Sequence, residues 1–308
     1  IKLINFNKMA YNINDLDNRL KNYLEVNKDE LITKAIFNSN ISRLFNIQTG
    51  VTSEKAIVRL DSTVNFTELG CSFNPTGTDK FTNRMLTPSF ITVNKVFCDK
   101  DLLKTWAHAD VTISATGETM PFEQQILENN TKIISAEIEK LLWVGDKTAG
   151  TGNMAFADGI YTIAKADADT HKMTKGSDNL MTRIQKIWMA LDPAVADSMT
   201  LVTSVTNYKS LIVELMNANM YHVFEQYDGE YRMRLPFANI DIIGIEALEG
   251  KDVIMAVKFD ELYYGVGLEG DAEDIDMFYS RDDRNFKFVA NFVVATNYAF
   301  SENVWINE

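Results

Sequence analysis

The sequence predicts an α+β fold organised around one long helix, and three observations support this prediction. Apolar residues recur at helical spacing over residues 121–144, which predicts one uninterrupted helix. Two β-rich runs, at residues 56–60 and 89–97, flank a polar segment and predict a long two-stranded hairpin with an irregular tip. Near the end of the chain, residues 275–280 and 286–300 predict a second hairpin.

The predicted central helix, residues 121–144, would extend about 36 Å at the usual rise per residue. Pro121 suits its first turn, where a missing N–H costs no hydrogen bond, and Gly145 follows its last apolar turn. Its apolar positions are Phe122, Ile126, Ile133, Ile134, Ile138, Leu141 and Leu142. Asn129 and Asn130 interrupt this stripe, so the helix is expected to serve two packing sites or to meet another subunit halfway.

Composition excludes several classes of protein. The chain has 308 residues, of which 46% are hydrophobic and 24% are charged, as is ordinary for a globular protein. No apolar run approaches the length that spans a membrane. Cys71 and Cys98 are too few for a disulfide scaffold and are expected to be buried thiols of a protein from a reducing compartment. Thirty basic against 43 acidic side chains give a formal net charge of −13, which argues against gripping nucleic acid by its phosphates.

Residues 1–50 are predicted to form an N-terminal arm. A helix is expected to start at Asn14-Asp15. Its apolar positions are Leu16, Leu20, Leu24, Leu31, Ile32, Ala35 and Ile36. Polar residues are dense between them, so this helix is marginal by itself and requires a partner surface. The chain starts at Ile1 rather than at Met, which is expected of a processed or trimmed chain or of a part of a longer one.

The hairpin region, residues 51–100, has too few apolar residues to form a core of its own. We expect it to lie across a neighbouring subunit, where its anchors would be Phe66, Leu69, Phe73 and Phe81. The alternative is that the hairpin folds back on the central helix of its own chain.

The region between the central helix and the terminal hairpin is predicted to contain both helices and strands. Asp178 is expected to cap a helix that ends at Asp192-Pro193. The apolar positions of this helix are Leu180, Ile184, Ile187, Trp188 and Leu191. Thr206 is expected to cap a third helix. Strands are expected at residues 199–205, 240–245 and 253–259.

Few residues suggest chemistry. Residues 265–270 match the G-x-G-x-x-G pattern of dinucleotide-binding loops, but the acidic run 271–276 follows where a pyrophosphate would need a helix N-terminus. The acidic run lacks EF-hand spacing and is expected to be a solvated loop rather than a cation site. His108, His171 and His222 share no metal-ligand spacing. We therefore predict no catalytic, cofactor-binding or metal-binding residues, and a structural protein rather than an enzyme.

Several segments carry a resemblance to a known family. They are GCSFNPTG at 70–77, FTNR at 81–84, VNKVFC at 93–98, PFE at 121–123, EKLLWVGD at 139–146 and FADGI at 156–160. With this order of parts, the sequence resembles the major capsid proteins of tailed double-stranded DNA phages, which have the Hong Kong 97-like capsid fold, and most closely those of crAss-like phages. The resemblance covers most of residues 45–308.

The resemblance implies a shell subunit with a defined set of parts. They are an N-terminal arm (1–50), an extended hairpin or E-loop (51–100), a peripheral domain with the spine helix (101–155, helix 121–144), an axial domain (156–270) and terminal strands that return to the peripheral domain (271–308). It implies self-assembly as pentamers and hexamers into an icosahedral head around DNA, without sequence-specific DNA binding, cofactors or a membrane. Portal, scaffolding and cement proteins would be further partners.

The resemblance also implies where the protein is located and how the chain is processed. The protein would be assembled in the bacterial host cytoplasm and found in the virion. Removal of a scaffolding segment by a maturation protease would account for a start at Ile1. The negative net charge suits a container wall, since a basic inner wall would hold DNA too tightly for ejection. Two alternatives stay open, an encapsulin shell that encloses cargo enzymes and a dinucleotide-dependent enzyme that uses residues 265–270.

Overall fold

The computed structural model describes residues 13–37, 39–66, 77–98, 100, 122–219, 225–226, 231–235, 240–267 and 274–308. Their contacts divide the chain into two compact units. The first comprises Ile1–Asn38, Phe90–Ser135 and Gly270–Phe292, and the second comprises Ser39–Ser89, Ala136–Glu269 and Val293–Glu308. Within the described residues, no helix is long and apolar enough to cross a bilayer.

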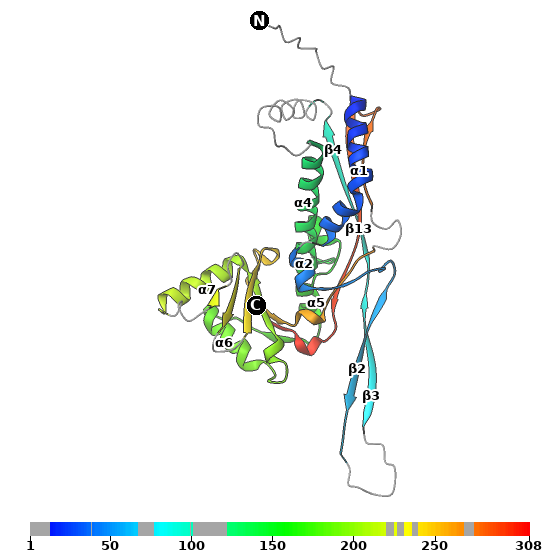
Figure 1. Cartoon of the computed structure of the whole chain (residues 1–308). Coiled ribbons are helices and arrows are strands. Elements are labelled where there is room, and N and C mark those ends of the chain that lie inside the picture. The colour runs from blue at the N-terminus through cyan, green and yellow to red at the C-terminus, as the bar shows by residue number, and fades with distance from the viewer. Residues whose placement is uncertain are drawn as a thin grey trace. The chain divides into compact units, whose positions relative to one another are not determined.

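In the first unit, helix α1 (Ile13–Ile36) packs against strand β12 (Asp274–Ser280), as Figure 1 shows. The buried positions of α1 are those predicted, Leu16, Leu20, Leu24, Leu31, Ile32, Ala35 and Ile36. The Asp17 carboxylate accepts a 3.0 Å hydrogen bond from the backbone N–H of Tyr279, and Lys28 forms an ion pair with Asp274. The partner surface that this thinly apolar helix requires is therefore a strand of its own chain.

Strand β12 pairs antiparallel with β13 (Asn285–Tyr298), which confirms the predicted terminal hairpin. The turn between them includes Arg284, which has a positive φ of 54°. Alternate residues of β13 are buried, namely Phe286, Phe288, Ala290 and Phe292. Strand β4 (Ser89–Cys98) also pairs with β13, and the Thr92 hydroxyl lies 2.9 Å from the side-chain oxygen of Asn291.

Helix α4 (Phe122–Val144) confirms the predicted central helix, and it contributes to both units. In the first unit the polar position Asn130 is buried, because its side-chain oxygen accepts a 2.8 Å hydrogen bond from Nζ of Lys95. In the second unit the buried Trp143 packs edge-to-face on Phe45, with ring centroids 5.3 Å apart. Ile133, which was expected on the apolar stripe, is 46% exposed. The buried face of α4 thus runs through Leu127, which was not predicted, rather than through Ile133, and a hydrogen bond fills its polar gap.

The largest sheet in the described part of the second unit is mixed, with the strand order β5-β14-β10-β6-β9-β8-β7. Its strands are β5 (His171–Met173), β6 (Thr200–Ser204), β7 (Glu225–Gln226), β8 (Arg232–Leu235), β9 (Ile240–Ile245), β10 (Ile254–Val257) and β14 (Trp305–Asn307). Helices α6 (Leu180–Ala190) and α7 (Val205–Asn217) bury their apolar faces with it in one core. The strands predicted at 199–205, 240–245 and 253–259 are confirmed.

Both helix caps differ from the prediction by one or two residues. The Asn179 side chain, not Asp178, accepts a hydrogen bond from the first turn of α6. Ser204, not Thr206, does the same for α7. Asp178 instead forms an ion pair with Lys186. Asn and Ser cap helices as well as Asp and Thr do, so residue type alone did not distinguish the neighbouring positions.

The remaining elements of the second unit are short, apart from a two-stranded hairpin. Strand β1 (Asn46–Gln48) pairs parallel with β11 (Leu262–Gly265), and β11 pairs antiparallel with the C-terminal part of β13. The short helices are α2 (Ser39–Leu44), α5 (Ile160–Ala166), η1 (Gly152–Ala155), η2 (Ala196–Ser198), η4 (Glu246–Leu248), η5 (Phe259–Glu261) and η6 (Ser301–Asn303).

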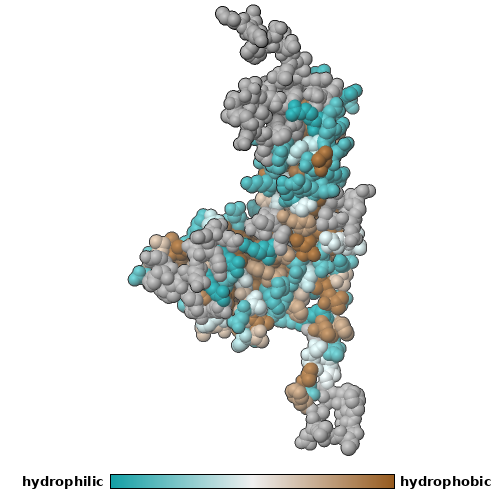
Figure 2. Space-filling model, viewed as in Figure 1, coloured by the Kyte–Doolittle hydropathy of each residue, from teal (hydrophilic) through white to brown (hydrophobic). Residues whose placement is uncertain are grey.

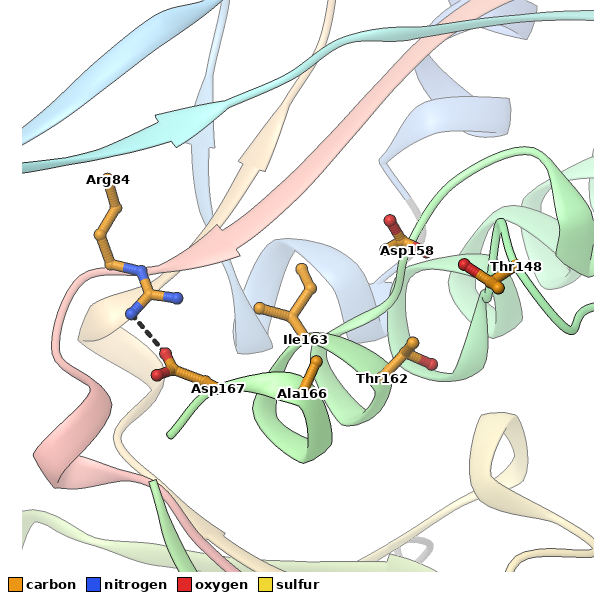
Figure 3. Close-up of a pocket in the computed structure, with 7 residues that line it drawn as sticks. All are labelled: Arg84, Thr148, Asp158, Thr162, Ile163, Ala166 and Asp167. Carbon is orange, nitrogen blue, oxygen red and sulfur yellow. Dashed lines mark hydrogen bonds and ion pairs between the residues drawn. The ribbon is translucent and has the colours of Figure 1, made fainter. Parts of the chain in front are cut away.

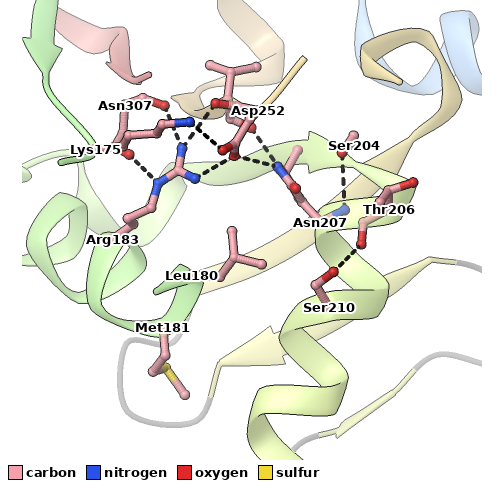
Figure 4. A network of polar contacts seen from close by, with 12 residues as sticks. Lys175, Leu180, Met181, Arg183, Ser204, Thr206, Asn207, Ser210, Asp252 and Asn307 are labelled. Carbon is pink, nitrogen blue, oxygen red and sulfur yellow. Dashed lines mark hydrogen bonds and ion pairs between the residues drawn. The ribbon is translucent and has the colours of Figure 1, made fainter. Parts of the chain in front are cut away.

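A polar network fastens the last strand, β14, to helix α6 (Figure 4). The buried Arg183 donates from Nε to the side-chain oxygen of Asn307 (2.5 Å) and from Nη2 to the Asn307 carbonyl (3.0 Å). Its Nη1 lies 2.6 Å from the Asp252 carboxylate, which also binds Lys175 at 2.7 Å. Strand β14 has only three residues, and the charged hydrogen bonds from Arg183 add to the few backbone hydrogen bonds that hold it.

Candidate functional site

The two-stranded hairpin of the second unit is the candidate site. Strand β2 (Lys55–Thr63) pairs antiparallel with β3 (Thr78–Leu86), in register from Lys55↔Leu86 to Thr63↔Thr78 (Figure 1). The predicted partner of the first strand, residues 89–97, was wrong, because that run is β4 and pairs with β13. β3 lies within the segment expected to be polar and irregular, and it lacks the apolar alternation that would identify a strand.

One face of this hairpin is apolar and open to solvent. Directly paired residues share a face, so Ala56 and Met85, Val58 and Asn83, and Leu60 and Phe81 lie together. We call Ala56, Val58, Leu60, Phe81 and Met85 the apolar face. Val58, Leu60 and Phe81 are 67%, 54% and 68% exposed. Hydrophobic patches lie along the hairpin in Figure 2. Such a row of exposed apolar side chains is typical of a surface that another molecule covers.

The opposite face, which we call the anchored face, packs on its own chain near the root of the hairpin. Ile57 and Leu86 are buried there in a small cluster with Val51, Ala295 and Ala299. Past this root, the described side chains on both faces are exposed through residues 62–66 and 77–81. The alternative that the hairpin folds back on the central helix is therefore not seen for these residues.

Arg84 makes the strongest contacts of the anchored face. Its Nη1 donates to the Asp167 carboxylate at 2.7 Å, and its Nε donates to the side-chain oxygen of Asn297 at 3.3 Å. The guanidinium also lies over the ring of Tyr298, 4.2 Å from its centroid. Burial would raise the pKa of Asp167, but hydrogen bonds from Arg84, a backbone N–H and the Tyr298 hydroxyl lower it to about 2. The inner ion pair, Arg84–Asp167, is thus a half-buried network rather than a lone surface contact.

Arg59 makes a second contact on the anchored face. Both of its terminal nitrogens donate to the Glu302 carboxylate, and its guanidinium lies 4.7 Å from the ring centroid of Phe300. The Glu302 side chain is 47% exposed, against 14% for Asp167. The outer ion pair, Arg59–Glu302, is therefore the more solvated of the two.

The inner ion pair leads to a prediction on acid stability. The pKa of Asp167 is about 2 in the folded chain, below its ordinary 3.8, so its contribution is complete above about pH 4 and is lost as the pH falls toward 2. In urea unfolding of the unassembled chain, Asp167→Asn should flatten the loss of stability between pH 4 and 2. The exposed Asp282 of the β12–β13 turn provides the control variant Asp282→Asn. Equal acid slopes in all three proteins would contradict the assignment.

An open pocket of about 560 Å³ lies beside the inner ion pair (Figure 3). Arg84 and Asp167 line one end of it, and Thr148, Asp158 and Thr162 lie toward the other. The Asp158 carboxylate accepts a hydrogen bond from the backbone N–H of residue 147 at 2.8 Å. The carboxylates of Asp158 and Asp167 both accept hydrogen bonds from the chain, so each has a structural role at this pocket.

The residues singled out for chemistry occupy structural positions where they are described. Gly265 ends β11, where a Cβ would lie 3.1 Å from both Val51 and Ala295, so close packing explains this glycine. Asp274 starts strand β12, so the acidic run continues into a strand where the dinucleotide motif needs a helix. Among the described residues, no cluster of three His, Cys, Asp or Glu could hold a metal. The ring of His171 stacks on Trp305 at 4.7 Å.

Some of the predicted anchors and thiols lie in the described part of the chain, and others lie outside it. Phe66 and Phe81 are 98% and 68% exposed, as an intersubunit contact requires. Cys98 is exposed, so its predicted burial was wrong, because it occupies the solvent-facing side of β4. The predicted residues that lie outside the described part of the chain are Leu69, Phe73, Cys71, His108 and His222. Val58, Leu60 and Met85 were not predicted as contacts, although the alternation of Ala56, Val58 and Leu60 is visible in the sequence.

Solved structures of capsids and shells resemble this chain over most of its length. A chain of the satellite phage P4 procapsid has a TM-score of 0.64 at 12% identity, with 96% of this chain and 98% of that one covered. A chain from the capsid of an empty GTA particle has a TM-score of 0.62 at 9% identity, with 87% and 88% covered. A chain of the holo-SrpI encapsulin complex from Synechococcus elongatus has a TM-score of 0.56 at 9% identity, with 89% of this chain and 88% of that one covered.

These similarities define the class of fold. At such low identities they show that this chain has the fold of capsid and shell subunits, which are structural proteins rather than enzymes. No protein-family model and no curated protein matches the sequence.

Proposed function

We propose that this chain is the major capsid protein of a tailed double-stranded DNA phage, with the Hong Kong 97-like fold and closest to the capsid proteins of crAss-like phages. It assembles as pentamers and hexamers into an icosahedral head that encloses DNA, and it forms part of the virion. The observation that carries this proposal is the hairpin, with its root anchored on its own chain and its apolar face exposed in a chain that has a shell-subunit fold.

The apolar face requires a cover, and a second copy of the chain is the occupant that a shell supplies. Val58, Leu60 and Phe81 are each more than half exposed in the isolated subunit, which costs free energy that an interface recovers. Phe66 lies past the end of β2 and is almost fully exposed. We assign Phe66, Leu69, Phe73 and Phe81 as the anchors at this interface.

The family's domain scheme gives each part of the chain a proposed role. The hairpin is the extended loop, α4 is the spine helix, and residues 156–270 are the axial domain around the symmetry axes. Among the described residues, six strands of this range, β5 to β10, lie in one mixed sheet, which supports this axial assignment. Assembly in the host cytoplasm, a portal and scaffolding proteins are further parts of the proposal.

Assembly of the purified chain tests the proposal. Negative-stain imaging at high protein concentration should show closed shells of uniform size. Leu60→Asp and Phe81→Asp should each weaken shell formation by more than about 30-fold, because each puts a carboxylate into a desolvated contact. The matched variants Leu60→Val and Phe81→Leu keep the apolar character and should assemble. A monodisperse monomer at every concentration would refute a shell protein.

An encapsulin shell is the second candidate, because a chain of an encapsulin complex resembles this one with a TM-score of 0.56. Both candidates predict closed shells, so the contents distinguish them. Shells purified from their native source should hold double-stranded DNA if the chain is a phage capsid protein. Shells that hold cargo enzymes and no DNA would favour the encapsulin.

A further inference from the structure

The anchored face of the hairpin raises the question of what fixes the direction in which the hairpin leaves its subunit. Both arginines of this face contact one C-terminal segment, residues 297–302. Arg84 pairs across the ribbon with Ile57, and Arg59 lies two residues farther from the root. The two contacts are therefore about 7 Å apart along the hairpin. Two separated contacts with one segment define an angle, whereas a single contact leaves it free to change.

The two contacts differ in strength. The inner ion pair, Arg84–Asp167, has a carboxylate that is 14% exposed, and it lies beside the buried Ile57 and Leu86. The outer ion pair, Arg59–Glu302, has a carboxylate that is 47% exposed, and exposed pairs contribute little to stability. The outer pair can therefore open while the inner pair and the apolar cluster keep the root in place.

A small rotation at the root is enlarged farther along the hairpin. Past Arg59, the strands continue through four paired positions, from Leu60↔Phe81 to Thr63↔Thr78. This is about 13 Å of ribbon, and its described side chains are exposed on both faces. Phe81 and Phe66 lie in or past this stretch, so the angle at Arg59 decides where these side chains point.

We propose that Arg59 and Glu302 are positioning residues for assembly, which set the angle of the hairpin without touching the neighbouring subunit. This inference rests on the proposed function, since it concerns the surface that the neighbour covers. The pair acts on the direction of the apolar face and not on the stability of the subunit. The outer ion pair keeps the hairpin in the orientation in which its apolar face can bind the neighbouring subunit.

The angle can be measured without assembly. Two spin labels, at Ser62→Cys on the hairpin and Gln185→Cys on α6, report the distance between the hairpin and the body of the same unit. Both sites are exposed, and Cys71→Ser and Cys98→Ser remove the native thiols. In an unassembled Phe81→Asp background, the distance distribution should be narrow. Glu302→Gln or Arg59→Gln should at least double the width of this distribution. The exchanged pair, Arg59→Glu with Glu302→Arg, should bring the width most of the way back to that of the wild-type pair.

The assembly arm uses the same variants with Phe81 intact. Glu302→Gln should melt within about 2 °C of the wild type but form shells at least about 10-fold more slowly, and the exchanged pair should recover. Asp178→Asn, which breaks an ion pair of α6, is the control and should assemble normally. Unchanged widths and unchanged assembly in the single variants would overturn the inference. So would an exchanged pair that narrows the distances but still fails to assemble, because Arg59 or Glu302 would then contact the neighbour. Failure of the wild type to form shells would overturn the proposed function instead, and the label distances would still report on the pair.

Discussion

Replacing Arg183 with alanine should lower the free energy of unfolding by about 3 kcal/mol and the melting temperature by roughly 5 °C. Arg183 is buried in α6, and its guanidinium is the donor to both acceptors of Asn307 described above. Alanine would leave the side-chain oxygen of Asn307 without this donor in a buried place, and such a loss costs about 1–3 kcal/mol. The aliphatic part of the arginine is lost as well, which adds a packing cost.

Two matched variants distinguish the buried hydrogen bonds of Arg183 from the exposed ion pair between Lys175 and Asp252. Lys175→Gln removes another partner of Asp252, but both side chains are nearly half exposed, so the expected loss is below about 0.5 kcal/mol. Arg183→Lys keeps the charge but cannot form the same planar set of hydrogen bonds, so its melting temperature should fall between those of the wild type and Arg183→Ala. Hydrogen exchange should show β14 opening first in the alanine variant. A melting temperature unchanged by Arg183→Ala would show that the network does not hold this strand.

The periodic elements of the fold could be predicted because each carries its own signal. Helices α1 and α4 and the β12–β13 hairpin show apolar spacing along one continuous segment, and their predicted bounds agree with the structure within a few residues. β3 carried no such signal. Thr82 and Arg84 lie on the anchored face of β3, and Phe81 and Met85 lie on its exposed face. Neither face of β3 therefore shows the apolar alternation by which a strand can be predicted from its own sequence.

The candidate site was predictable in part for the same reason. The exposure of Phe66 and Phe81 could be predicted, because they are large aromatic residues in a segment that has too few apolar residues to bury them. Arg59 and Arg84 were missed, since single arginines among polar residues usually mark solvated positions. Their partners are distant in sequence, and 243 residues separate Arg59 from Glu302. No local pattern encodes such a pair.

Shortening the hairpin should abolish shell formation and leave a folded subunit. The variant lacks residues 61–80 and joins Leu60 to Phe81 by an Asn-Gly turn, which suits the direct pairing of these two residues. It removes the distal ribbon and three of the four proposed anchors, Phe66, Leu69 and Phe73. It keeps Arg59, Arg84 and the buried cluster at the root, so the second unit retains its core. The variant should therefore melt cooperatively within about 2 °C of the wild type, because the removed described side chains are exposed.

A second variant separates the length of the hairpin from its chemistry. Replacing residues 61–80 with a Gly/Ser chain of equal length keeps the reach but none of the anchors, and it should also fail to assemble. Sedimentation and negative-stain imaging measure assembly, and calorimetry measures folding. If the shortened chain does not fold, the hairpin belongs to the core of its own subunit. If it forms shells of normal stability, the hairpin is not the contact that joins subunits, because the distal anchors would then be dispensable.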